Sequence, residues 1–179
     1  MTAEAWLERV VERAIAVQQI PAPTFAESAR GALVRQLFVD EGLTDVQVDR
    51  VGNVMACLPG NGLAKPLIVS AHLDTVFPAG TDLTLRRDAE KVYAPGIGDN
   101  SLGVAGLFGL IWELKARSFP LPGDVWVVAN VCEEGLGDLR GMKAVVERFG
   151  AAVTGYIVLE GMSLGYVFHR GLGGRRYRV

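Results

Sequence analysis

Three short apolar runs, each rich in β-branched or aromatic residues, constrain the fold of this chain more than any other feature. They occupy residues 66–69, 125–128 and 156–158. Uncharged runs of this length predict buried strands. Helical patterns lie between them, and strands that alternate with helices predict right-handed crossovers. We therefore expect an α/β fold of three layers, in which helices cover both faces of a mostly parallel central sheet.

Acidic and imidazole side chains follow each of these runs. His72 and Asp74 come after the first run, Glu133 and Glu134 after the second, and Glu160 after the third. Ligands of open parallel sheets bind beyond the carboxyl ends of the strands, so we expect these side chains to converge at one edge. Imidazole and carboxylate groups are typical ligands of divalent metal ions. The sequence therefore predicts a site for one or two such ions.

The spacing within each pair suggests separate roles. His72 and Asp74 are two residues apart, so both side chains of an extended chain lie on one face. A metal-binding histidine usually donates its other ring N–H to an oxygen acceptor, which Asp74 could supply. Glu133 and Glu134 are adjacent and point to opposite sides, so one can bind metal while the other acts as a general base. The alternatives are a strand end followed by a turn for the first pair, and a solvated acidic turn for the second.

Asp99 follows a glycine-containing loop, residues 96–98, and precedes an apolar helix predicted over 101–115. Its position fits an ordinary N-cap residue. It also fits a carboxylate that bridges two cations, because the glycines let the backbone come close and the side chain turn inward. Both interpretations remain open at this point.

The other elements are predicted from periodicity. Apolar residues at helical spacing indicate a helix over 3–18, a second helix that ends at about residue 40, and a further helix over 140–149. Thr24 and Glu27 have the spacing of a capping box at the start of the second helix. Residues 81–92 favour a peripheral hairpin, and residues 165–169 favour a final strand.

Composition excludes several classes of protein. The chain has 179 residues, half of them hydrophobic, and a formal net charge of −2, which predicts one domain with a sizeable core. Apart from arginines near its end it shows no basic patch, so we expect no nucleic-acid partner. No apolar run is long enough to span a membrane, and the charged N-terminus does not resemble a signal peptide. We expect a cytoplasmic protein.

In order and spacing, four motifs resemble those of the dinuclear zinc exopeptidase and deacylase family: residues 71–78, 98–100, 133–135 and 160–161. That family includes aminoacylase, glutamate carboxypeptidase, succinyl-diaminopimelate desuccinylase and peptidase T. The resemblance extends to residues 51–54 and implies Zn²⁺ as the usual cofactor, with Co²⁺ or Mn²⁺ able to replace it. It also implies a role for each site residue: His72 and Glu160 on one ion, Glu134 on the other, Asp99 bridging them, Glu133 as general base, and Asp74 orienting His72.

The sequence departs from that family pattern at its end. The family's second metal ion takes a further histidine from a later segment, and His169 is the only other histidine here. We interpret His169 as a polar residue that ends the last strand rather than as a metal ligand. Residues 1–169 resemble the N-terminal part of the catalytic domain, and residues 170–179 resemble the start of a lid domain through which a homodimer would form.

The expected function is metal-dependent hydrolysis of peptide or N-acyl amide bonds, with a small peptide or an N-acyl amino acid as substrate. The alternative is a non-catalytic metal-binding or assembly fragment of such an enzyme. A nucleotide-binding α/β domain is disfavoured, because Gly96 and Gly98 are not followed by the third glycine of the dinucleotide motif.

Overall fold

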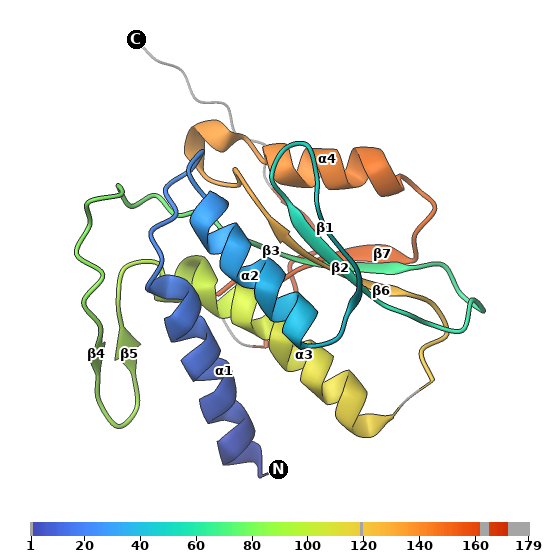
Figure 1. Cartoon of the computed structure of the whole chain (residues 1–179), viewed down its shortest axis with the longest axis horizontal. Helices are drawn as coiled ribbons and strands as arrows, with labels where there is room; N and C mark the ends of the chain where they lie inside the picture. Colours follow the sequence, from blue (N-terminus) through green and yellow to red (C-terminus); the bar gives the residue numbers. More distant parts are fainter. Residues whose placement is uncertain (1, 119, 162–164, 172–179) are drawn as a thin grey trace.

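Five strands form one sheet around which the rest of the chain is arranged (Figure 1). The computed structural model describes residues 2–118, 120–161 and 165–171. The order across the sheet is β1-β2-β6-β3-β7. In sequence order these strands are β1 (Thr44–Val48), β2 (Val54–Leu58), β3 (Leu67–His72), β6 (Val125–Asn130) and β7 (Gly155–Val158).

The sheet is mixed, with one reversed strand among those described. β3 pairs in parallel with both β6 and β7, whereas β2 pairs antiparallel with both β1 and β6. Four strands therefore run in the same direction, and only β2 opposes them. The predicted α/β class and mostly parallel sheet are confirmed. The three strands predicted to carry site residues, β6, β3 and β7, are neighbours, so their carboxyl ends share one edge.

Helices cover both faces of this sheet, as the alternation of buried strand residues requires. On one face Val69 and Ala71 of β3 join the large core cluster with α1 (Ala3–Gln18), α2 (Ser28–Asp40) and α3 (Gly103–Arg117). On the other face Ile68 joins a smaller cluster with Val145 of α4 (Arg140–Phe149). The fold therefore has three layers.

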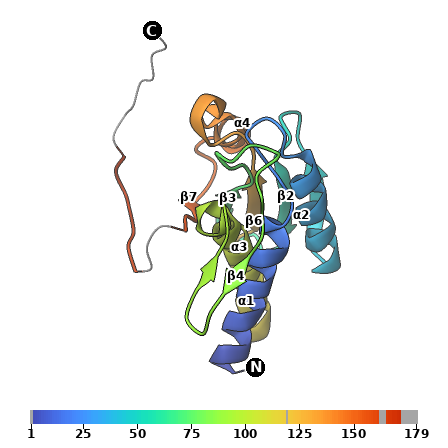
Figure 2. The ribbon, with the colours of Figure 1, turned by 90° about the vertical axis from the view of Figure 1, so that its left-hand side faces the viewer.

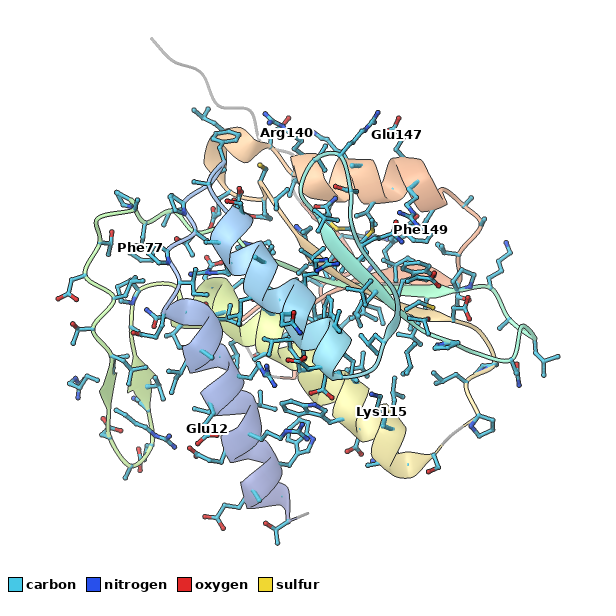
Figure 3. The ribbon with its side chains drawn as sticks, viewed as in Figure 1. Glu12, Phe77, Lys115, Arg140, Glu147 and Phe149 are labelled. Carbon is cyan, nitrogen blue, oxygen red and sulfur yellow. The ribbon has the colours of Figure 1, made fainter. Side chains whose placement is uncertain are left out.

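The layer formed by α4 is amphipathic. Its Phe149 ring lies 5.4 Å from the ring of Trp126 on β6, measured between centroids. Glu147, two residues earlier, extends from the opposite side of the helix (Figure 3) and is exposed. Charged residues thus face solvent while the apolar side of α4 closes the second core.

Several predicted elements are found at the expected positions, and others differ. The helices over 3–18 and 140–149 have the predicted bounds. The peripheral hairpin is confirmed but short, with β4 (Arg86–Arg87) paired to β5 (Val92–Tyr93). The predicted strand over 165–169 is wrong: residues 166–170 have no regular structure, and the segment 165–171 runs apart from the folded body (Figure 2). Most of the predicted lid segment, residues 172–179, lies outside the described residues.

The predicted capping box is also wrong. Glu27 itself occupies the N-cap position of α2 and makes no side-chain cap hydrogen bond. The Thr24 hydroxyl donates instead to Asp74, and the Glu27 carboxylate accepts from the backbone N–H of Cys132. Tertiary partners have replaced the local pairing that the spacing favoured.

None of the helices in the described part of the chain has both the length and the apolar character needed to cross a bilayer.

Candidate metal centre

His72 ends β3 at the middle of the ligand-bearing edge. It is 2% exposed and lies in register with Asn130 of β6. Its Nδ1 is 3.0 Å from the backbone carbonyl oxygen of Asp74. A carbonyl oxygen only accepts hydrogen bonds, so Nδ1 carries a proton, and Nε2 is the ring nitrogen that remains to contact other groups. The local chain therefore aims Nε2 at the space beyond the strand ends.

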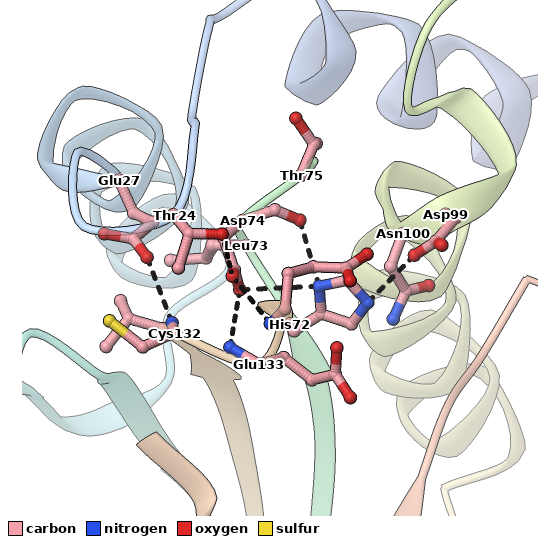
Figure 4. Close-up of polar contacts among 12 residues, drawn as sticks. Thr24, Glu27, His72, Leu73, Asp74, Thr75, Asp99, Asn100, Cys132 and Glu133 are labelled. Carbon is pink, nitrogen blue, oxygen red and sulfur yellow. Dashed lines mark hydrogen bonds and ion pairs between the residues drawn. The ribbon is translucent and has the colours of Figure 1, made fainter. Parts of the chain in front are cut away.

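Carboxylates from two other segments meet this nitrogen (Figure 4). The Nε2 atom of His72 lies 3.0 Å from Oδ1 of Asp99 and 3.5 Å from Oε2 of Glu160. Ligand atoms of His72, Asp99 and Glu134 all lie within 4.8 Å of one another. Side chains that follow β3, β6 and β7 are thus brought together with one from the segment before α3.

Asp74 is fully buried, and its carboxylate connects the segment after β3 to the Glu133–Glu134 segment after β6. Its Oδ1 accepts the backbone N–H of Glu133 and its Oδ2 that of Glu134, both at 2.9 Å. The Thr24 hydroxyl donates to Oδ2 at 2.9 Å. Although burial opposes it, hydrogen bonding by His72, Glu133, Glu134 and Thr24 lowers the pKa of Asp74. The carboxylate lies 3.5 Å from Nδ1 of His72, so its backbone carbonyl makes the closer contact with the ring.

The Asp99 and Glu160 segments approach each other backbone to backbone. A Cβ atom at Gly161 would overlap the carbonyl oxygen of Gly98, so this approach requires glycine. Next to it, Nδ2 of the buried Asn100 donates to the Leu159 carbonyl at 2.9 Å. The Asn100 Oδ1 accepts the N–H of Gly103, the first residue of α3, at 3.0 Å. The Asp99–Asn100 peptide bond is cis.

Negative charge accumulates around the single imidazole of this cluster. Burial alone would lower the pKa of His72, but hydrogen bonds to Asp74 and Glu160 and the nearby carboxylate charges raise it to about 10. Burial raises the pKa of both Glu133 and Glu134, and the surrounding carboxylates raise it further. Carboxylates packed this closely favour a cation between them.

The donor set fits a divalent metal ion. It offers one imidazole nitrogen and carboxylate oxygens, which are ligands that zinc accepts. The carboxylates of Asp99 and Glu160 remain partly exposed, with side-chain accessibilities of 62% and 35%. Ions could therefore reach these carboxylates from solvent, whereas the imidazole of His72 is buried.

Arg30, a buried residue of α2, contacts the strand end next to the site and was not among the predicted site residues. It is 2% exposed, and its Nη1 donates to the Leu73 carbonyl at 2.7 Å. Its Nε and Nη2 donate to the Ile20 carbonyl at 2.9 and 2.6 Å. Burial lowers the pKa of Arg30 to about 10, although the charge of Asp74 opposes this shift. The sequence contained a signal for the burial of Arg30, because Arg30 precedes Val34 by one helical turn and the two residues lie on the same buried face of α2.

His169 does not join this cluster. It lies in the exposed segment 165–171, and the grouped ligand atoms found among the described residues do not include it. The prediction that His169 ends a last strand is wrong, because residues 166–170 have no regular structure.

Comparison with known proteins identifies the family. A model of peptidase family M20/M25/M40 matches residues 68–171. The chain is 28% identical over 123 residues to a succinyl-diaminopimelate desuccinylase of Corynebacterium glutamicum, a match that covers 69% of this chain and 33% of that protein.

Solved structures show the same fold. The aminopeptidase PepT of Bacillus cereus superposes with a TM-score of 0.72 and 25% identity, covering 86% of this chain and 43% of that one. A dinuclear metal-binding peptidase of the M20 family from Bacillus subtilis superposes with a TM-score of 0.61 and 16% identity, covering 88% and 43%. The chain thus spans less than half the length of these relatives. Because the family model matches more than half of the 179 residues, this chain belongs to peptidase family M20/M25/M40.

Proposed function

We propose that this chain carries the metal-binding part of a hydrolase that cleaves peptide or N-acyl amide bonds. The observation that carries the proposal is the meeting of His72 Nε2 with Asp99 and Glu160 at one edge of the sheet, with Glu134 beside them. The metal ligands in this proposal are His72, Asp99, Glu134 and Glu160, with Asp99 shared between two ions. Zn²⁺ is the proposed cofactor, and Co²⁺ or Mn²⁺ would replace it.

A divalent cation held there would supply Lewis acidity toward an amide carbonyl and toward a water molecule. Glu133 is the proposed general base. It takes a proton from the attacking water and later gives it to the leaving amine. Asp74 keeps Glu133 in place, because its carboxylate accepts the backbone N–H of Glu133 and of the adjacent Glu134. Base and metal ligand are thereby held on one turn.

The substrate class is proposed from the relatives. One is a desuccinylase, which acts on an N-acyl group, and another is an aminopeptidase. Both activities break an amide bond, so a dipeptide and an N-succinyl amino acid are the substrates to test first. A cytoplasmic location, a lid beginning near residue 170 and a homodimer formed through it remain predictions.

Glu133→Gln tests this function. The variant keeps the size of the side chain but cannot accept the proton, so we expect hydrolysis to fall by at least about 100-fold. Zinc affinity, measured by calorimetry, should remain within about twofold of wild type. Glu147→Gln, at an exposed position on α4, is the matched control and should leave both quantities unchanged.

Two outcomes would contradict the proposal in different ways. Full hydrolysis by Glu133→Gln would remove Glu133 as the base. A wild-type chain that binds none of the three metals would remove the metal site itself. Metal binding without hydrolysis of either substrate would favour the alternative, a metal-binding fragment without activity of its own.

A further inference from the structure

Four consecutive backbone amides just after β6 are each accepted by a buried side-chain oxygen. The N–H of Val131 donates to Asn53 at 3.0 Å, and that of Cys132 donates to Glu27 at 3.0 Å. The next two amides, of Glu133 and Glu134, donate to the two oxygens of Asp74. The three acceptors come from separate segments of the chain and are at most 5% exposed. Side chains, rather than another strand, therefore determine the path of this segment.

The segment needs such support because its backbone leaves the strand sharply. Cys132 has a φ of 53°, a left-handed conformation that residues with a side chain seldom adopt. Such a conformation persists when surrounding contacts hold it. The contact at this residue is the Glu27 carboxylate, whose Oε1 accepts the Cys132 N–H. Glu133, the proposed base, follows directly.

Glu27 also connects this turn to the other side of the site. The same Oε1 atom accepts the N–H of Phe25 at 3.0 Å. Thr24, the residue before it, donates its hydroxyl to Asp74. The carboxylate of Glu27 thus holds both the turn that carries Glu133 and the loop that contacts Asp74 (Figure 4). A charged acceptor forms stronger hydrogen bonds to N–H groups than a neutral one.

We propose that Glu27 is a positioning residue, which fixes the Glu133–Glu134 turn through the Cys132 amide. Among the described residues its carboxylate accepts the backbone N–H groups of Phe25 and Cys132, and it reaches the site through the second of these. The functional part of this inference rests on the proposed function, whereas the structural part stands on hydrogen bonds that can be measured in the chain itself.

The test compares Glu27→Ala with Glu27→Gln by amide hydrogen exchange and by titration with Co²⁺. Glu27→Ala removes the acceptor, so we expect the Cys132 and Glu133 amides to exchange about tenfold faster or more. Glu27→Gln keeps the volume and one acceptor oxygen, so it should restore at least part of the protection. Co²⁺ affinity should fall about tenfold in Glu27→Ala and less in Glu27→Gln, because Glu134 moves with the turn.

Glu41→Gln is the matched control. Glu41 is a partly buried carboxylate whose acceptor bond comes from the indole of Trp112, in the C-terminal half of α3. This variant should leave exchange at Cys132 and Co²⁺ affinity unchanged. Glu27→Gln keeps the test decisive even where Glu27→Ala does not fold.

Unchanged protection of Cys132 and Glu133 in Glu27→Ala, or faster exchange that is equally large throughout α1 and α3, would overturn the positioning role. If protection falls as expected but the wild-type chain binds no Co²⁺, the positioning of the turn holds and the proposed function fails. If Co²⁺ binds but its affinity does not respond to the freed turn, the link from Glu27 to the site is wrong.

Discussion

The two sides of the candidate metal centre are built in different ways. On the β3–β6 side His72 and Asp74 are buried, and side-chain oxygens hold the turn that bears Glu133. On the β7 side Asp99 and Glu160 are partly exposed, and their segments meet through glycine backbone. The first side is organised by the fold itself. The second is the side on which a bound cation would do most to fix the ligands.

The largest expected effect comes from the buried side. His72→Ala removes the imidazole around which the carboxylates gather, and zinc affinity should fall by at least about 100-fold, as measured by calorimetry. His169→Ala is the matched control, because it removes the other histidine from an exposed position. Equal losses in the two variants would break the comparison, since the buried side would then have no special role.

A smaller effect is expected at the acceptor beneath the turn. Asp74→Asn replaces one accepting oxygen by an NH₂ group, which then faces a backbone N–H of Glu133 or Glu134. We expect a loss of about 1–3 kcal/mol in the free energy of unfolding, measured with urea. Asp124→Asn is the control, because Asp124 accepts a single backbone N–H, from Gly60, and asparagine can still accept it. A loss at Asp124 as large as at Asp74 would show that the double acceptor has no special importance.

The smallest effect should follow a change on the β7 side. Gly161→Ala forces the segment of Glu160 away from Gly98. Because these ligands are partly exposed and can readjust, we expect zinc affinity to fall only about tenfold. Gly155→Ala, at the start of β7 with no atom within 4 Å of the added methyl group, should leave affinity unchanged. A loss in Gly161→Ala as large as in His72→Ala would mean that both sides are equally rigid.

Sequence patterns predicted the parts of this molecule that depend on local periodicity. Apolar runs located β3, β6 and β7, and the rule that ligands bind beyond parallel strand ends indicated where His72 and Glu160 would meet. Helical spacing located α4 to the residue. β3 and β6 are buried on both faces, which an uninterrupted apolar run indicates, and α4 buries one face, which its helical period indicates. The predicted burial of the third run is wrong, because Ile157 and Val158 of β7 are exposed at the edge of the described sheet.

Other features depend on residues that are distant in sequence and could not be predicted from spacing. Thr24 and Glu27 have a capping-box spacing, yet Glu27 bonds to Cys132, 105 residues further along the chain. The reversed direction of β2 depends on its pairing with β6, which no local pattern encodes. The apolar residues within 165–169 favoured a strand. A strand also needs a neighbouring strand to pair with, and the sequence does not specify one.

The guanidinium of Arg30 has a consequence for building hybrids of this chain with its relatives. It binds carbonyl groups of the α1–α2 connection and of the strand end that bears His72 at the same time. Lysine has one nitrogen and cannot make this set of contacts. Exchange of the first two helices therefore has to bring residues 18–23 together with Arg30 as one block. A crossover placed inside that block would combine Arg30 with a connection from another protein, and the hydrogen bonds between them would be lost.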